Sequence, residues 1–263
     1  MIGLKIEDAI KINKNLEKYV VEKNGKMRLN LKNKIALIEY NKTILKALFG
    51  LDVEFHKEAL VPTPVNRYLF VQSIDRSLKK LKNQKEINIL EIGTGATTVI
   101  ALIAAKCFNY NVIATEVVDE YLEYAKKNVL KNNLENKIKI IHSKGNIIKN
   151  IPEMENRRFD VILSYPPFYD KNAVSSGRKF GGALARDVEL IGGGKYGEEF
   201  SLQIIEEGID FLNENGIIAL MMPKKPEERR KLIIEKMKEV GLSVEVDEIR
   251  TGNRLRYIIK GIK

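Results

Sequence analysis

Cysteine and histidine are scarce in this sequence of 263 residues, and their scarcity excludes two kinds of site. The single cysteine, Cys107, cannot form a disulfide within the chain, so a reducing, cytoplasmic setting is expected. The two histidines, His56 and His142, lack the cysteine or carboxylate spacing of a metal site. We therefore expect no bound metal. We interpret Cys107, which lies in the apolar run 100–108, as an inert core residue.

Long hydrophobic runs are absent as well. No stretch approaches the roughly 18 consecutive apolar residues of a membrane span, and residues 1–5 show no signal-peptide pattern. We therefore expect no membrane partner. Glutamine is rare among abundant Lys, Glu and Ile, which favours a heat-adapted source. The length suits one large domain or a core domain with an appendage, and we expect a monomer.

Positive charge is concentrated in the first third of the chain. Residues 1–86 contain 18 Lys and Arg against 10 Asp and Glu, whereas residues 87–263 contain 27 against 25. Most of the net charge of +10 therefore precedes residue 87. A localised basic region is typical of proteins that bind the phosphate backbone of nucleic acids. A solvated helical face on a lysine-rich protein would explain the same distribution equally well.

The hydrophobic pattern divides the chain at the polar joint 82–86. Before the joint, the spacing of apolar residues predicts helices over 4–22 and 34–49, separated by a turn at Asn24-Gly25. A third helix is expected to follow Pro62-Thr63-Pro64 and to end near residue 81. We interpret 1–86 as a helical, basic N-terminal module that binds nucleic acid, and 87–263 as a second domain.

From residue 87 onwards, strands alternate with helices. The expected strands are 87–92, 111–116, 137–142, 159–164, 216–222, 242–249 and 255–262, and the expected helices are 97–108, 119–133, 199–213 and 226–240. This alternation predicts an α/β fold with a mostly parallel sheet and helices on both faces. Only Thr251-Gly252-Asn253 separates the last two strands, so we expect them to form an antiparallel hairpin at one edge.

The segment Glu91-Ile92-Gly93-Thr94-Gly95-Ala96 follows the first expected strand and opens a helix. Glycines let the backbone pass close to a ligand, and a helix N-terminus favours negative charge. Thr98 occupies the position of the third glycine of dinucleotide-binding proteins, which counts against a pyrophosphate cradle. Glu116 ends the next strand, where a carboxylate can accept hydrogen bonds from both ribose hydroxyls of an adenosine cofactor. A purely structural turn and a solvated glutamate are the alternative interpretations.

A buried strand that runs into a double proline is the most informative feature of the chain. It comprises Asp160-Val-Ile-Leu-Ser164-Tyr165-Pro166-Pro167-Phe168. Prolines donate no backbone hydrogen bond, so this rigid loop can offer free carbonyl groups to a ligand. The ring of Phe168 can stack on a nucleobase. The long, glycine-rich and basic connection 169–197 that follows is expected to be a mobile lid that grips the substrate.

From about residue 17 to the end, the chain resembles the adenine-N6 RNA methyltransferases, a family that includes methyltransferase-like protein 16 of animals and the bacterial large-subunit rRNA enzyme. The seven expected strands, which end in a hairpin, match the strand order along the chain of the methyltransferase fold of that family. The stretches that carry the resemblance are 24–32, Val61-Pro62-Thr63 with Arg67, 92–96, 114–117, 124–129, Gly193-Gly194, 198–200, and Gly252 with Arg256.

The resemblance implies a seven-stranded, Rossmann-like class I methyltransferase fold for 87–263. It implies S-adenosyl-L-methionine as cofactor and a structured RNA, ribosomal or small, as partner. Arg67 is then expected to hold the cofactor carboxylate, and Glu116 its ribose. Gly93 and Gly95 are expected to pass beneath its methionine part. Further cofactor contacts are expected from Glu91, Thr94, Asn146 and Ser164, and RNA contacts from Arg28, Lys32, Arg178, Lys179, Arg254 and Arg256.

The catalytic motif is where the chain departs from that family. The family has Asn-Pro-Pro-Phe, whereas this chain has Tyr165-Pro166-Pro167-Phe168. By resemblance, Phe168 stacks on a flipped base and the Pro166 carbonyl accepts from its amine. A phenol is normally a donor, so Tyr165 replaces the usual asparagine acceptor poorly. We expect methylation of adenine N6, with another RNA atom, or an RNA-binding module with little catalysis, as the alternatives.

Overall fold

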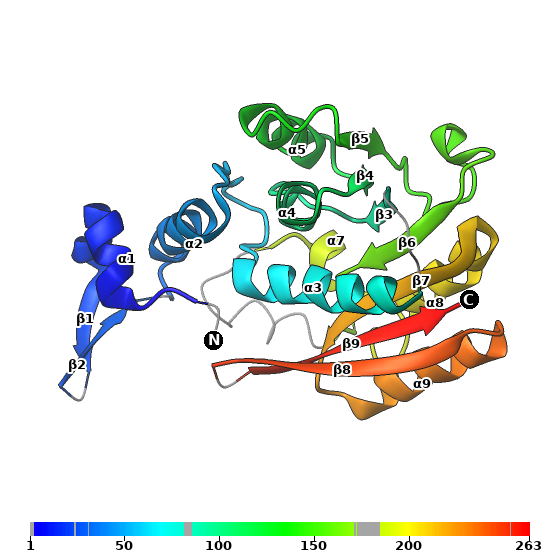
Figure 1. Ribbon diagram of the computed structural model, residues 1–263. Helices are drawn as coiled ribbons and strands as arrows, with labels where there is room; N and C mark the ends of the chain where they lie inside the picture. The colour runs from blue at the N-terminus through cyan, green and yellow to red at the C-terminus, as the bar shows by residue number, and fades with distance from the viewer. Residues whose placement is uncertain are drawn as a thin grey trace.

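The computed structural model describes residues 3–23, 25–30, 32–81, 86–170, 172, 185–252 and 254–263. Its centre is a seven-stranded sheet with the order β5-β4-β3-β6-β7-β9-β8 (Figure 1). The strands are β3 (Asn88–Ile92), β4 (Asn111–Glu116), β5 (Ile138–His142), β6 (Phe159–Ser164), β7 (Leu212–Pro223), β8 (Ser243–Thr251) and β9 (Arg254–Ile262). The five strands β3, β4, β5, β6 and β7 are parallel to one another, whereas β9 is antiparallel to β7 and β8. The predicted sheet and its terminal hairpin are confirmed.

Both faces of the sheet are buried beneath helices. α3 (Pro64–Leu81) and α4 (Val99–Phe108) pack on one face, and α5 (Asp119–Lys131) contributes to the same core. α8 (Glu199–Gly208) and α9 (Glu227–Glu239) pack on the other face. Along β6, Val161 and Leu163 point into the first core and Ile162 into the second, as the period of two in a strand requires. A strand that is covered on both faces has a nearly continuous run of hydrophobic residues in its sequence.

The predicted helix 199–213 is too long. α8 ends at Gly208, the 3-10 helix η3 (Ile209–Phe211) follows, and β7 begins at Leu212. Leu212 pairs with Phe159 of β6 and is buried in the sheet core, so sheet pairing overrides the helical spacing there.

The start of the N-terminal module also differs from its prediction as a helix over 4–22. Only α1 (Ile6–Ile12) is α-helical; η1 (Lys14–Tyr19) is a 3-10 helix, and β1 (Val20–Lys23) pairs with β2 (Lys26–Leu29) in a hairpin. The Asn13 side chain accepts a hydrogen bond from the Asn15 N–H, which helps to end α1. Val20 and Val21 are β-branched and favour the strand that follows. The predicted helix is therefore wrong beyond Ile12.

The rest of the module follows the prediction. α2 (Lys34–Phe49) has the expected bounds, because Asn33 caps its first turn and Gly50 ends it with a φ of +63°. Leu45 of α2 and Phe70 of α3 belong to the same core as α4. The polar joint lies largely outside the described residues, so the domain division remains a prediction.

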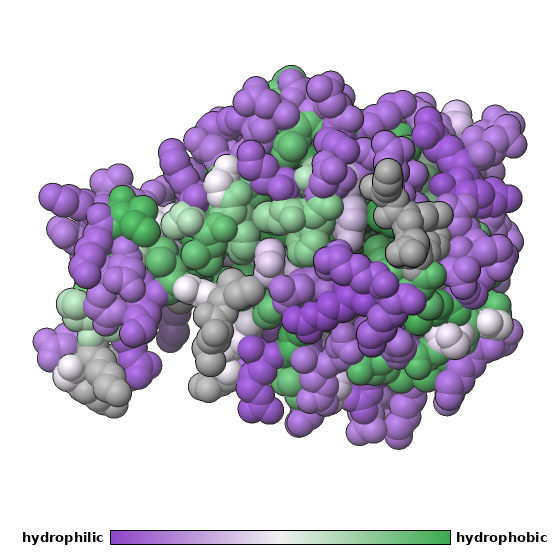
Figure 2. Space-filling model, viewed as in Figure 1, coloured by the Kyte–Doolittle hydropathy of each residue, from purple (hydrophilic) through white to green (hydrophobic). Residues whose placement is uncertain are grey.

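The surface of the described residues is mainly hydrophilic in the view of Figure 2, with a band of hydrophobic residues over α2 and the adjoining core. Within this part of the chain, no helix has both the length and the hydropathy to cross a membrane. Cys107 is exposed, not buried as its apolar surroundings predicted. It lies in the last turn of α4 beside the exposed Lys106, on the side that faces away from the sheet.

Candidate functional site

A cavity of about 330 Å³ lies where β3, β4 and β6 end. The carboxyl ends of parallel strands are the usual place for a ligand in an open α/β sheet. All eight residues that the sequence analysis assigned to a cofactor line this one cavity: Arg67, Glu91, Gly93, Thr94, Gly95, Glu116, Asn146 and Ser164. Tyr165 and Pro167 of the double-proline loop line it too, whereas Pro166 and Phe168 do not.

The turn after β3 forms the floor of the cavity. Gly93 and Gly95 have φ values of +72° and +68°, which side chains other than glycine rarely adopt. A Cβ on either glycine would meet no atom within 4 Å, so backbone conformation and not space requires glycine here. Thr98 also has a positive φ, of +53°, and precedes α4 as its N-cap residue.

Backbone donors fix the Glu116 carboxylate at the end of β4. Its Oε2 accepts from the Gly95 N–H at 2.8 Å, and its Oε1 accepts from the N–H groups of Val117 at 2.8 Å and Val118 at 2.9 Å. Burial raises the pKa of Glu116, and the three N–H groups act against that rise. The carboxylate is thereby held in one orientation at the cavity wall. Its Oε1 accepts two hydrogen bonds and its Oε2 accepts one, so one acceptor site is left, on Oε2.

Glu91 and Arg67 bring opposite charges to the buried end of the cavity. Burial raises the pKa of Glu91 to about 7, although its Oε2 accepts from the Thr94 hydroxyl at 3.0 Å. Burial also lowers the pKa of Arg67 to about 10. The Arg67 side chain is 8% exposed and makes no hydrogen bond or ion pair within the described part of the chain. A desolvated guanidinium without an acceptor calls for an anionic ligand.

Tyr165 lies between two arginines. The Arg67 guanidinium carbon is 4.4 Å from the centroid of the Tyr165 ring. The Arg256 Nε–H donates to the Tyr165 hydroxyl oxygen, with an N–O distance of 2.6 Å. Of the residues assigned to RNA, Arg256 is thus brought to the site, and Arg28, Lys32 and Arg254 are exposed away from the cavity. Arg178 and Lys179 lie outside the described residues.

The Phe168 ring is surrounded by side chains of its own chain. Its centroid is 6.1 Å from that of Tyr165 and 4.6 Å from that of Tyr169. The Arg229 guanidinium carbon is 5.4 Å from the same ring, and Arg229 donates to the Phe168 carbonyl and, at 3.0 Å, to the Tyr196 carbonyl. Arg229 is 2% exposed, and burial lowers its pKa to about 10. No sequence signal distinguishes Arg229 from the other charged residues of α9.

The segment 190–200 is bound to the double-proline loop by backbone hydrogen bonds. The Tyr169 N–H donates to the Leu190 carbonyl at 2.8 Å, and the Gly192 N–H donates to the Tyr169 carbonyl at 3.0 Å. A Cβ on Gly192 would lie 2.5 Å from the Pro167 carbonyl oxygen, so this approach requires glycine. Residues 171 and 173–184, the middle of the expected lid, lie outside the described residues. The mobility of the lid therefore stays a prediction.

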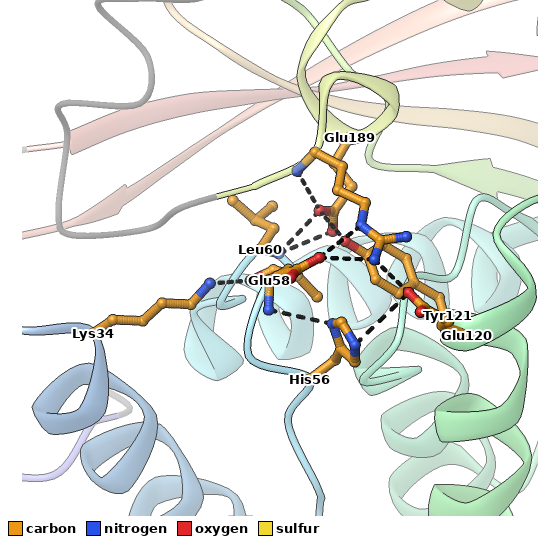
Figure 3. A network of polar contacts seen from close by, with 9 residues as sticks. Lys34, His56, Glu58, Leu60, Glu120, Tyr121 and Glu189 are labelled. Carbon is orange, nitrogen blue, oxygen red and sulfur yellow. Dashed lines mark hydrogen bonds and ion pairs between the residues drawn. The ribbon is translucent and has the colours of Figure 1, made fainter.

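A polar network (Figure 3) surrounds Leu60 and Glu189, two residues that line the cavity. Glu189, in α7 (Asp187–Leu190), accepts from the Leu60 N–H at 2.9 Å and from the Tyr121 hydroxyl at 3.0 Å. Arg186 forms ion pairs with Glu58, at 2.8 Å, and with Glu120. The Lys34 Nζ of α2 donates to the Ala59 carbonyl at 2.8 Å, which links the N-terminal module to this network. The sequence analysis missed these partners because they are far apart along the chain.

The fold and the cavity are those of a class I methyltransferase, and the comparisons with known proteins support this. A family model described as RNA methyltransferase matches residues 5–258. The chain therefore belongs to this RNA methyltransferase family and is an enzyme of that class.

Relatives of the chain include archaeal and animal proteins. A protein of Methanocaldococcus jannaschii, provisionally named a methyltransferase, is 65% identical over the whole length of both chains. A U6 small nuclear RNA (adenine-(43)-N(6))-methyltransferase of Drosophila melanogaster is 27% identical, over 95% of this chain and 86% of its own. Human METTL16, named an RNA N(6)-adenosine-methyltransferase, is 30% identical over 59% of this chain, which corresponds to 28% of the human protein.

Solved structures agree on the fold. A methyltransferase from Pyrococcus furiosus has a TM-score of 0.71 at 38% identity and covers 88% of this chain and 98% of its own. The catalytic domain of human METTL16 in complex with an RNA hairpin has a TM-score of 0.82 at 22% identity, over 98% of this chain and 92% of its own. The predicted fold class is confirmed.

Proposed function

We propose that this RNA methyltransferase binds S-adenosyl-L-methionine in the cavity and methylates N6 of an adenine in a structured RNA. The observation that carries the proposal is Arg67, a buried cation that lines the cavity and has no acceptor among the described residues. Glu116 and the Gly93 and Gly95 turn line the same cavity. The names of the Drosophila and human relatives support adenine N6 as the acceptor.

The residues present fit this cofactor. The Arg67 guanidinium would hold its carboxylate, and the fixed Glu116 Oε2 would accept from a ribose hydroxyl. The positive φ values of Gly93 and Gly95 let the backbone pass beneath its methionine part. The cofactor supplies a methyl group on a positively charged sulfur, so that transfer leaves a neutral thioether.

The double-proline loop would position the acceptor amine. An exocyclic amine is a poor nucleophile because its lone pair is delocalised into the ring, and an acceptor for its hydrogens helps it to become pyramidal. No donor within the described part of the chain occupies the Pro166 carbonyl oxygen, so this atom can accept such a hydrogen. Orientation of the amine in line with the methyl group can lower the barrier by roughly 7–11 kcal/mol. The amine proton then leaves to water.

The RNA would lie across the N-terminal module and the β8–β9 tip. Arg28 and Lys32 are exposed in the module, and Arg254 is exposed at the tip. The module carries most of the excess positive charge of the chain, which suits phosphate contacts. We propose that the protein acts as a cytoplasmic monomer on ribosomal or small RNA.

One observation favours a second candidate function, the methylation of a different RNA atom. The Tyr165 hydroxyl oxygen already accepts from Arg256, and its hydrogen has no acceptor within the described part of the chain, so the hydroxyl is set up to donate. A donor at this position suits a ring nitrogen or a carbonyl oxygen of a base better than an amine. The two candidates differ in the modified nucleoside that they produce.

The experiment that tests the proposal compares modified nucleosides in RNA from a strain with the gene and from a deletion strain. Mass spectrometry should show N6-methyladenosine falling at one site in the deletion strain and returning with the wild-type gene. A Phe168→Ala gene should not restore it, because the flipped base loses its stacking partner. Loss of another methylated nucleoside would favour the second candidate, and no difference would favour an RNA-binding role with little catalysis.

A further inference from the structure

Tyr165 contacts two arginines, Arg67 and Arg256, that are far apart along the chain. Arg67 belongs to α3 and covers one face of the tyrosine ring, and Arg256 belongs to β9 and donates to its hydroxyl oxygen. Asparagine, which the related enzymes carry at this position, has no ring face to offer a guanidinium. The tyrosine therefore makes one contact that the usual residue cannot make.

The ring contact acts on the cofactor side. Arg67 is buried, and both its own desolvation and the nearby charge of Arg256 disfavour its cationic form. The negative face of an aromatic ring attracts a guanidinium, and the attraction is strongest where water is excluded. The Tyr165 ring thus stabilises the Arg67 guanidinium and fixes its long side chain in the wall of the cavity.

The hydroxyl contact acts on the opposite side. Arg256 is partly exposed and belongs to β9, which starts at the tip that carries Arg254. With its Nε–H bound to Tyr165, the other N–H groups of Arg256 make no hydrogen bond within the described part of the chain, so they can donate to a ligand such as phosphate. The Tyr165 side chain therefore contacts one arginine that lines the cavity, Arg67, and one that does not, Arg256.

We propose that Tyr165 is a positioning residue, whose ring aims Arg67 at the cofactor carboxylate and whose hydroxyl aims Arg256 at RNA. This inference rests on the proposed function. It assigns to the tyrosine a role different from that of the asparagine in related enzymes. The two contacts use different parts of one side chain, so substitutions can separate them.

The ring contact is tested by calorimetry on the full chain with two ligands. S-Adenosylhomocysteine carries the carboxylate, whereas 5′-methylthioadenosine lacks it. Tyr165→Leu should weaken binding of S-adenosylhomocysteine roughly 3- to 30-fold, the range between an exposed and a desolvated cation–π contact, and leave binding of methylthioadenosine unchanged. Tyr165→Phe keeps the ring and should bind both ligands as the wild type does. An equal loss of both ligands in Tyr165→Leu would mean general damage to the cavity and would overturn the inference.

The hydroxyl contact is tested with a labelled synthetic RNA hairpin that has unpaired loop adenines. Tyr165→Phe and Arg256→Gln should weaken binding of this hairpin to a similar extent, and the double variant should be no weaker than Arg256→Gln. Additive losses would show that the two residues act independently and would contradict the proposal. If the wild-type chain binds no S-adenosylhomocysteine, the proposed function itself fails, whatever the variants do.

Tyr165→Asn separates positioning from chemistry. The asparagine restores an amine acceptor but removes the ring from Arg67. The KM for S-adenosylmethionine should therefore rise, while kcat at saturating cofactor stays the same or increases. An unchanged KM would contradict the role of the ring.

Discussion

The Gly95 N–H donates to the Glu116 Oε2 at 2.8 Å and so joins the turn after β3 to the end of β4. The two residues lie close together because β3 and β4 pair in parallel, with Ile92 opposite Thr115. This bond fixes the carboxylate before any ligand arrives. Such preorganisation reduces the entropic cost of ligand binding.

Glu116→Gln should therefore weaken cofactor binding. The amide keeps the shape of the side chain but places an N–H₂ group against one of three backbone donors, and it accepts less well from ribose hydroxyls. A charged hydrogen-bond partner contributes roughly 1.5–3 kcal/mol, and calorimetry with S-adenosylhomocysteine should show a loss of that size. Glu123→Gln, on the exposed face of α5, is the control. Equal affinities of the two variants would show that Glu116 does not contact the ligand.

The stability of the cofactor-free protein should depend on the protonation of Glu91. Its folded pKa of about 7 exceeds the ordinary value of 4.5, because burial disfavours the carboxylate. The stabilising contribution of the protonated Glu91 carboxyl is thus fully present below pH 4.5 and is lost as the pH rises through 7. The shift corresponds to on the order of 3 kcal/mol.

Glu91→Gln removes this titration. Unfolding free energies are measured with denaturant between pH 4.5 and pH 8. The value for Glu91→Gln minus the value for the wild type should increase as the pH rises. A constant difference between the two proteins across this range would contradict the assigned pKa shift.

RNA binding should lose part of its salt dependence when charges of the N-terminal module are removed. Arg28→Gln and Lys32→Gln should each flatten the slope of log affinity against log salt by about 0.7–0.9. The control is Lys238→Gln. Lys238 is an exposed residue of α9, far from the module along the chain, and its substitution should leave the slope unchanged. Anisotropy titrations of a labelled hairpin RNA measure all three. Slopes identical to that of the wild type would exclude the module as the phosphate-binding surface.

Phe168→Ala should separate catalysis from cofactor binding. Phe168 does not line the cavity, so affinity for S-adenosylhomocysteine should not change. Stacking of a base on an aromatic ring contributes roughly 1–3 kcal/mol, so kcat/KM for RNA should fall by about one to two orders of magnitude. Steady-state methyl transfer to RNA checks this expectation. Undiminished transfer would mean that another group holds the base.

Local patterns predicted most of the fold and, together with the family resemblance, the cofactor side of the cavity. The bounds of α2 follow from Asn33 and Gly50, which are local signals. The clustering of Gly93 with Glu116 follows from parallel pairing of successive strands, a rule that needs no coordinates. All eight predicted cofactor residues line one cavity, and Arg67, which belongs to α3, was expected there from the family resemblance.

The substrate side was less predictable, because it depends on contacts between distant residues. Tyr165 and Arg256 are 91 positions apart, and no periodicity connects them. Arg229 lies in a helix of charged residues, and only tertiary packing shows that it is buried against Phe168. The hairpin of β1 and β2 is a separate case, because local strand pairing there outweighed the helical spacing of the apolar residues.

The most direct test of the account is transfer of a deuterated methyl group from S-adenosylmethionine to RNA isolated from the deletion strain. After digestion, mass spectrometry identifies the nucleoside that carries the label. We predict deuterated N6-methyladenosine with the wild-type protein, formed about one to two orders of magnitude more slowly with Phe168→Ala. Label in any other nucleoside, or no label in RNA although S-adenosylhomocysteine binds, would contradict adenine N6 as the acceptor.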